Sequence, residues 1–261
     1  MSALHMVSLP LALEPFRHWM ATRGLAADEG RALHHLLSES FGKGVLQPFR
    51  LMVGKDARQA TLYAYTQADE ATLCQTAAET GTPDALALVA LPDLRTKPMP
   101  AAWKEGRRFA FDVRVRPVRR LLKPLEAPPR SMGDAAAKPF RKGAEVDAFL
   151  VAALRDAAKD EPGVSDAPPG EPMTRESVYR AWLTERLAGA ARLDGASLVR
   201  MQRTRIARTK TAEGPDAVFH GELTVTDGEA FARLLAKGVG RHTAYGYGML
   251  LLRPARGPEK G

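Results

Sequence analysis

The sequence predicts an α+β fold in which the order strand, helix, strand, strand, helix, strand occurs twice. Three observations support this prediction: strand-like runs alternate with amphipathic helical segments, their order repeats, and 261 residues suffice for two small domains. This order is typical of the ferredoxin-like (RRM-like) pattern. We therefore expect two tandem ferredoxin-like domains, at 1–103 and 107–255, and the second carries a long helical and Pro-rich insertion at about 124–172.

The first half begins with a strand from Met6 to Leu13, in which Pro10 favours an edge strand or a bulge. The next element is a leucine-rich helix, with Asp28 as its N-cap and Gly42 just past its end. Further along the chain we expect strands at 49–53 and 59–66 and a helix at 69–80.

The second half begins with a strand over 107–119, because apolar side chains occupy every second position from Phe109 to Val115. Pro, Ala, Gly and charged residues dominate 123–143 and 160–172, which predicts loops on either side of a helix at 146–158. The remaining expected elements are a helix at 177–190, strands at 197–208 and 217–225, a helix at 228–236 and a strand at 246–252.

The overall composition indicates a globular protein with an excess of positive charge. Lys and Arg number 38 against 30 Asp and Glu, so the net charge of +8 favours a polyanionic partner, nucleic acid first and an acidic membrane surface second. No apolar run approaches the ~20 residues that span a bilayer and no signal peptide is evident, so we expect a cytoplasmic protein. Cys74 is the only cysteine, which excludes an internal disulfide and a cysteine-cluster zinc site.

The positive charge is concentrated in two segments. Residues 107–123 and 197–211 together carry a charge of +11, whereas the rest of the chain sums to −3. A local cluster of cations is what binding to RNA phosphates by counterion release requires. The basic side chains are Arg107, Arg108, Arg114, Arg116, Arg119, Arg120 and Lys123 in the first segment and Arg200, Arg203, Arg205, Arg208 and Lys210 in the second.

We expect the second basic segment to form a protruding hairpin that reads an RNA groove by shape and backbone. Its arginines change from odd to even positions between Arg205 and Arg208, which predicts a bulge or the approach to a turn. The alternative is a solvated strand face that merely uses arginine, although such a surface usually interleaves acids.

A glycine-rich segment, GVGRHTAYGYG at 238–248, follows a predicted helix and precedes a strand. A dinucleotide-binding fingerprint has the opposite order, and no Gly-Lys-Ser/Thr phosphate loop is present. Glycines allow close backbone approach and expose amides, with Arg241, His242, Tyr245 and Tyr247 nearby for phosphate contact or base stacking. The alternative is a tight helix-to-strand connection with packed tyrosines. The RNA-binding candidates here are Gly238, Gly240, Arg241, His242, Gly246 and Gly248.

The leucine-rich helix contains two adjacent histidines, His34 and His35, within RALHHLLSESF. At about 100° per residue, the leucines define the buried side, His34 lies at the margin of that side, and His35 points to water. A partly desolvated histidine is suited to acid–base chemistry near neutral pH. The alternative is that both are packing or surface residues.

Several motifs together resemble one protein family. FHGELTVTD at 219–227 and GVGRHTAYGYGMLLLRP at 238–254 are similar to the closing signature of the CRISPR-associated repeat-processing endoribonucleases of type I-E systems, the CasE family. FDVRVRP at 111–117, AWL at 181–183 and the Leu33-His34 pair resemble further family motifs in the same order. The resemblance covers nearly the whole chain except 124–172.

The resemblance implies metal-independent cleavage of RNA, in which a 2′-hydroxyl attacks its own 3′ phosphate and leaves a 2′,3′-cyclic phosphate. It implies that His34 is the acid or base, that Arg31 helps to hold the phosphate, and that no cofactor or metal takes part. Some members have a tyrosine at the position of Arg31, and Thr243 stands where some relatives have lysine. The basic side chains and the glycine-rich segment would hold the RNA.

The implied partners are the CRISPR repeat stem-loop, the mature crRNA and other subunits of the type I-E Cascade complex, including its Cas7-type backbone protein, with no membrane partner. Two alternatives stay open. One is a non-catalytic RNA-hairpin-binding subunit of such a complex, and the other is an unrelated basic protein that binds nucleic acid or acidic surfaces nonspecifically.

Overall fold

The computed structural model describes residues 3–54, 59–126, 139–157, 173–205 and 213–255. The first half of the chain forms β1 (His5–Ala12), α1 (Leu13–Thr22), α2 (Glu29–Phe41), β2 (Phe49–Val53), β3 (Gln59–Thr66), α3 (Glu70–Thr80), α4 (Pro83–Leu86), η1 (Leu91–Asp93) and β4 (Arg95–Pro98). The second half forms β5 (Arg108–Val115), β6 (Val118–Arg120), β7 (Glu145–Asp147), α5 (Ala148–Ala157), α6 (Arg175–Leu187), β8 (Ala191–Arg205), β9 (Glu213–Val225), α7 (Gly228–Lys237), η2 (Thr243–Tyr245) and β10 (Leu250–Pro254).

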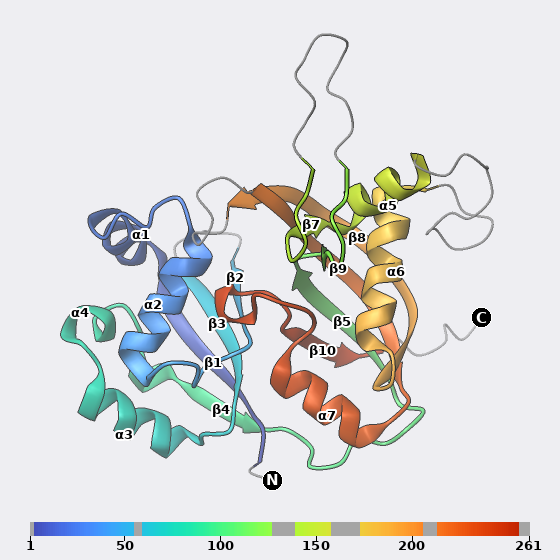
Figure 1. Cartoon of the computed structure of the whole chain (residues 1–261). Helices are drawn as coiled ribbons and strands as arrows, with labels where there is room; N and C mark the ends of the chain where they lie inside the picture. The colour runs from blue at the N-terminus through green and yellow to red at the C-terminus, as the bar shows by residue number, and fades with distance from the viewer. Residues whose placement is uncertain (1–2, 55–58, 127–138, 158–172, 206–212, 256–261) are drawn as a thin grey trace.

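These elements build an α+β protein on two four-stranded antiparallel sheets (Figure 1). The first sheet has the order β2-β3-β1-β4 and the second β10-β5-β9-β8, so both follow the same permutation of a β-α-β-β-α-β unit. This arrangement is consistent with the two expected ferredoxin-like domains. The proposed domain boundaries, 1–103 and 107–255, stay a prediction.

The insertion contributes β7, which pairs with β6 just before the insertion to form a two-stranded sheet, and then α5. We predicted a helix from 146, but β7 occupies 145–147 because its main chain pairs with β6, and the helix begins at Ala148. Most of 124–172 lies outside the described residues, so the loops predicted for its Pro-rich parts stay a prediction.

Helix α2 is fixed at both ends by local chemistry. The Asp28 carboxylate accepts a hydrogen bond from the Arg31 amide at 3.0 Å, as an N-cap should, and Gly42 follows at a φ of 90°. Leu33 and Leu36 are fully buried against the first sheet, where each contributes ~1.5–3 kcal/mol by leaving water. The predicted helix and both its ends are therefore confirmed.

Polar contacts join the two sheets. The Tyr65 hydroxyl on β3 donates to the Leu250 carbonyl on β10 at 2.8 Å. Arg50 on β2 pairs with Asp112 on β5 at 3.2 Å, and both side chains are only 8% exposed. Burial lowers the pKa of Arg50, and the charge of Asp112 counteracts this effect. These contacts hold the two halves of the chain in one arrangement.

Several boundaries differ from the expected ones. The strand predicted at 107–119 is interrupted at Arg116 and Pro117, and the strand predicted from 197 begins at Ala191, with register shifts near Gly195 and Arg200. The last strand begins at Leu250 because the glycines before it adopt positive φ angles. Helix α1 and strand β4 were not predicted.

The edge-strand interpretation of Pro10 is wrong, because β1 lies between β3 and β4. Proline is tolerated there because β4 pairs only with His5–Ser8, which leaves this part of β1 without a β4 neighbour. The change of arginine parity between Arg205 and Arg208 lies outside the described residues. In the part of the chain that the structure describes, no helix is long and apolar enough to cross a membrane.

Candidate active site

A cleft of about 1090 Å³ lies where α2, the β6–β7 sheet, the start of β9 and the η2 segment meet. His34 lines this cleft together with Tyr245 and His242. Four cationic side chains line it as well, from Lys43, Arg116, Arg120 and Arg241, along with three acids, Glu145, Asp147 and Glu213. In Figure 1, η2 lies between α2 and the second sheet. Residues from both halves of the chain therefore form the cleft.

His34 is half-buried on α2 and faces the η2 segment. Its ring centroid lies 5.3 Å from that of Tyr245, with the planes inclined at 50°. The helix can approach η2 this closely because residue 30 is a glycine: a Cβ there would lie 2.6 Å from the Tyr245 carbonyl oxygen. His34 thus lies at the margin of the buried side of α2, as predicted, and its side chain forms part of one wall of the cleft.

The expected contrast between the two histidines is smaller than predicted. His35 is also half-buried, rather than facing water, because its ring packs edge-on against His34 with centroids 5.7 Å apart. His35 does not line the cleft, so position still distinguishes the two side chains. Arg31, one turn before His34 on α2, is exposed and is not among the residues that line the cleft, so its contact with the phosphate stays a prediction.

The glycine-rich segment is shaped by its glycines. Gly238, Gly240, Gly246 and Gly248 all have φ near +80°, which side chains with a Cβ rarely adopt. Three of them also allow close packing, since a Cβ on Gly238 would lie 2.8 Å from the Thr243 side chain, one on Gly240 would lie 2.8 Å from the Trp182 ring and one on Gly248 would lie 2.6 Å from the Val239 carbonyl oxygen. Each glycine therefore has a structural role, and contact with RNA stays a prediction for all four.

The two tyrosines of this segment differ. Tyr247 is buried, with its hydroxyl 3.1 Å from Thr204 Oγ1 and the Arg114 guanidinium 4.6 Å from its ring centroid. Tyr245 is half-exposed in the cleft beside His34. The packed-tyrosine alternative therefore describes Tyr247 and not Tyr245.

His242 and Arg241 share one carboxylate from the insertion. Glu145 Oε1 lies 2.6 Å from Arg241 Nε, and Glu145 Oε2 lies 2.8 Å from His242 Nε2. Burial lowers the pKa of His242, and the hydrogen bond and charge of Glu145 offset part of that effect. His242 is the one residue other than glycine with a positive φ, 65°, in the described chain. This conformation directs its side chain to the β6–β7 sheet.

Two of the predicted RNA-binding arginines on and after β5 make buried intramolecular contacts. Arg114 forms two hydrogen bonds with the fully buried Asp216, at 2.8 and 2.6 Å. Burial alone would lower the pKa of Arg114, but these bonds to Asp216 outweigh it and raise that pKa. Arg116 donates to the Thr204 hydroxyl and carbonyl at 2.9 Å, which ties the end of β5 to β8. RNA contact stays a prediction for both arginines.

The other predicted basic residues whose side chains the structure describes lie on the surface. Arg119 pairs with Glu185 at 2.7 Å, Arg120 is exposed at the cleft, and Arg200 and Arg203 are exposed on β8. Arg205 ends β8, whereas Arg208 and Lys210 lie outside the described residues. The basic hairpin is therefore described only at its base, as the paired strands β8 and β9.

Several polar residues that line the cleft were not predicted from the sequence, among them Lys43, Gln47 and Glu145. Lys43 follows α2, Gln47 donates to Thr243 Oγ1 at 2.8 Å, and Glu145 holds Arg241 and His242. Their sequence surroundings carry no distinctive spacing, and Glu145 lies in the segment that the family resemblance does not cover. Across the described ranges, no group of three or more His, Cys, Asp or Glu side chains could hold a metal ion.

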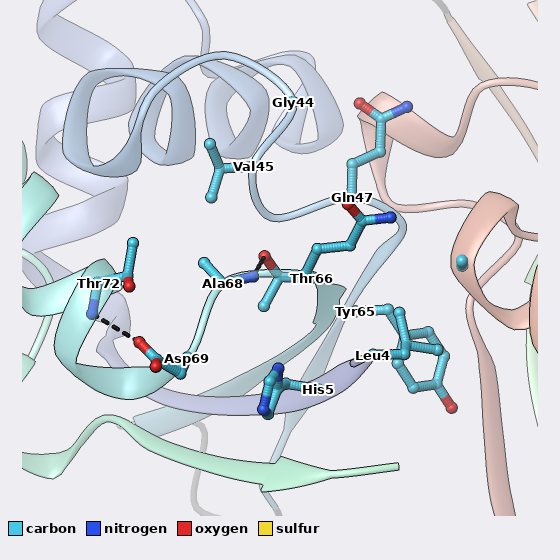
Figure 2. A pocket seen from close by; sticks show the side chains of 12 residues that line it. Leu4, His5, Gly44, Val45, Gln47, Tyr65, Thr66, Ala68, Asp69 and Thr72 are labelled. Atoms are coloured by element: carbon cyan, nitrogen blue, oxygen red, sulfur yellow. Dashed lines mark hydrogen bonds between the residues drawn. The ribbon is translucent and has the colours of Figure 1, made fainter. Parts of the chain in front are cut away.

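A second cavity, of about 610 Å³, lies on the other side of the loop that precedes β2 (Figure 2). Gly44 and Gln47 line both cavities, and His5, Tyr65 and Asp69 line this cavity but not the cleft at His34. The lining has no lysine or arginine, and the Asp69 carboxylate caps α3 by accepting from the Thr72 amide at 2.8 Å. The cleft at His34 is therefore the better candidate for binding an anion.

One protein family matches almost the whole chain. The family model described as CRISPR associated protein matches residues 5–254. A structure of the CRISPR endoribonuclease Cse3 bound to a 19-nt RNA is 20% identical, with a TM-score of 0.57 and coverage of 97% of this chain and 100% of that one. No curated protein matches the sequence.

Two further structures are similar. Thermus thermophilus Cse3, bound to an RNA representing a pre-cleavage complex, is 19% identical with a TM-score of 0.59, over 97% of this chain and 100% of that one. Cas6e from Escherichia coli K-12 is 18% identical with a TM-score of 0.56, over 96% and 100%. At these identities the likeness establishes the fold alone.

Proposed function

The chain belongs to the CRISPR-associated protein family, and from this premise we propose that it is a metal-independent endoribonuclease of CRISPR precursor RNA. It cleaves within the stem-loops of the repeats and gives mature guide RNA. One observation carries the proposal: His34 shares a single cleft with four cationic side chains. The resemblance of the fold to RNA-bound endoribonucleases supports it.

In the proposed reaction, the 2′-oxygen of one nucleotide attacks the adjacent phosphorus, and the bond from phosphorus to the 5′-oxygen of the next nucleotide breaks. The 2′-hydroxyl gives up a proton and the departing 5′-oxygen takes one, so the products are a 2′,3′-cyclic phosphate and a free 5′-hydroxyl. His34 performs one of these two transfers. The cations of the cleft, above all Lys43 and Arg120, stabilise the charge that develops on the phosphate.

We further propose that the protein stays bound to its product as a subunit of the type I-E Cascade complex, next to a Cas7-type backbone protein. Arg200 and Arg203 on β8, together with the hairpin beyond them, hold the stem of the repeat. Retention of the product makes a slow enzyme sufficient, because each copy then needs to cut only once. The alternative is a non-catalytic hairpin-binding subunit with the same basic surface.

Cleavage of the cognate repeat RNA in EDTA separates these functions. The wild-type protein in excess should cut the RNA and leave a cyclic phosphate, and a His34→Ala variant should cut ~10²–10⁴-fold more slowly with its RNA affinity retained. His18→Ala is the matched control, because His18 is exposed on α1, and it should cut like the wild type.

If the RNA stays intact with excess wild-type protein, the nuclease function is excluded and the non-catalytic hairpin-binding subunit is the function that fits. Full activity of His34→Ala, or cleavage of RNA that lacks the 2′-hydroxyl at the cut, would exclude the mechanism but not the nuclease function.

A further inference from the structure

The reaction proposed above needs two proton transfers, and His34 performs only one of them. A second histidine lines the same cleft: His242, just before η2. Its ring centroid lies 6.5 Å from that of Tyr245, whose ring also contacts His34. Two imidazoles from opposite halves of the chain therefore meet around one tyrosine, inside a cleft large enough for a phosphodiester.

The contact with Glu145 fixes the tautomer of His242. The carboxylate is held 2.6 Å from Arg241 Nε, so it is ionised and can only accept hydrogen bonds. The 2.8 Å contact with His242 Nε2 therefore requires the ring proton on Nε2, which leaves the lone pair of the neutral ring on Nδ1. Nδ1 makes no hydrogen bond with any residue that the structure describes.

A neutral imidazole whose far nitrogen donates to a carboxylate is the arrangement of a general base. The carboxylate orients the ring and stabilises the imidazolium that forms when the free nitrogen takes a proton. We propose that His242 is the general base that accepts the proton of the attacking 2′-hydroxyl on Nδ1, that Glu145 is its positioning residue, and that His34 donates the proton to the departing 5′-oxygen. This inference rests on the proposed nuclease function.

The proton balance closes without any further reactant. The 2′-oxygen loses its proton to His242 as its bond to phosphorus forms, and the 5′-oxygen gains one from His34 as its bond to phosphorus breaks. Afterwards His242 gives its extra proton to water and His34 takes one up from water, which restores the starting protonation states of both side chains. The cations that line the cleft keep the phosphate in place during the reaction.

Burial favours the neutral form of His242 and is the main cause of its lowered pKa. The hydrogen bond and charge of Glu145 on β7 raise that pKa, and the charges of Arg116, after β5, and the adjacent Arg241 lower it. The cleft also contains Lys43, Arg120, Asp147 and Glu213. Because the pKa lies below the ordinary 6.5, His242 is ready to accept a proton at pH 7.

Single-turnover cleavage by a His242→Asn variant tests the inference. Asparagine tolerates the left-handed backbone that residue 242 adopts, so the loop should keep its shape. We expect the rate to fall by ~10²–10³-fold while the affinity for the repeat RNA changes less than about twofold. Glu145→Gln should lower the rate less, because glutamine still accepts a hydrogen bond.

A substrate with sulfur in place of the bridging 5′-oxygen separates the two histidines, because a thiolate leaves without a proton. This substrate should restore most of the rate of His34→Ala and none of the rate of His242→Asn. Rescue of His242→Asn by the sulfur substrate would overturn its role as the base, and a His242→Asn variant with the wild-type rate would overturn any catalytic role.

The pH profile gives an independent readout that a structural role of His242 would not change. The wild-type rate should rise with pH through a midpoint below 6.5, where His242 loses its proton, and this acidic limb should be absent from His242→Asn. A limb that persists in the variant contradicts the inference. Wild-type protein that binds the repeat without cutting it would instead refute the nuclease function itself.

Discussion

Gly30 lies inside α2, where alanine normally stabilises a helix by ~0.5–1 kcal/mol. Here the Cβ of an alanine would lie 2.6 Å from the Tyr245 carbonyl oxygen, so α2 and η2 would have to separate. We predict that Gly30→Ala lowers the free energy of unfolding and also slows RNA cleavage, because His34 moves away from the opposite wall. Urea denaturation and single-turnover cleavage measure the two effects.

Gly195→Ala is the matched control, since a Cβ at that position meets no atom within 4 Å. Its stability and cleavage rate should stay close to those of the wild type. A Gly30→Ala protein more stable than the wild type would show that the contact between α2 and η2 is loose.

At the residue scale, the sequence predicted those site residues whose neighbours on the same helix define their position. His34 could be placed because the leucines around it define a buried side. The partial burial of His35 could not be predicted, because it results from the packing of its ring against the ring of His34. The contacts of Glu145 are equally hidden, since they depend on the folding of a distant insertion against the glycine-rich segment.

The strand pair β8 and β9 carries the predicted basic hairpin. We predict that replacing Arg203, Arg205 and Arg208 together by alanine weakens binding of the repeat RNA and makes its salt dependence shallower. The plot of log K against log salt has a negative slope, and the magnitude of this slope should decrease by about one for each phosphate that the variant no longer neutralises. Binding titrations between low and moderate salt measure this slope.

A control variant with alanine in place of Arg17, Arg95 and Arg233 removes the same charge from other exposed surfaces. Its slope should match that of the wild type. Equal slopes for all three proteins would place the RNA elsewhere.

At the scale of elements, segments with local start and stop signals could be predicted best. The N-cap of α2 and the alternation in β5 are local, and both elements were found. Strand β4 could not be predicted, because its four residues have no alternating pattern and become a strand only by pairing with β1. The first six residues of β8 could not be predicted as strand either, because they become a strand only by pairing with β9.

For the whole molecule, the buried pair of Arg50 and Asp112 joins the two sheets. We predict that Arg50→Met lowers the free energy of unfolding by about 3–5 kcal/mol, because it removes the buried partner of the Asp112 charge and leaves His220 beside it, at 2.8 Å. Cleavage should slow as well, since the cleft needs both halves. Urea denaturation measures the first effect.

The double variant Arg50→Met, Asp112→Leu should recover much of that stability, because a buried pair replaced by apolar side chains is often neutral. Arg17→Met, on the exposed face of α1, serves as the control for removing an arginine. An Arg50→Met protein as stable as this control would mean that water reaches the pair.

The two sheets themselves could be predicted from the order of strands and helices, but their docking could not. The pairing of Arg50 with Asp112 joins residues 62 positions apart, and that of Tyr65 with Leu250 joins residues 185 apart. Such contacts follow from the packed fold and leave no periodic trace in the sequence.

The walls of the cleft come from α2, β7 and η2, which are far apart in the chain. During synthesis, a nascent chain that has not reached Tyr245 contains His34 but lacks the opposite wall of the cleft. The proposed nuclease site is therefore incomplete until both halves of the chain have been synthesised and have docked.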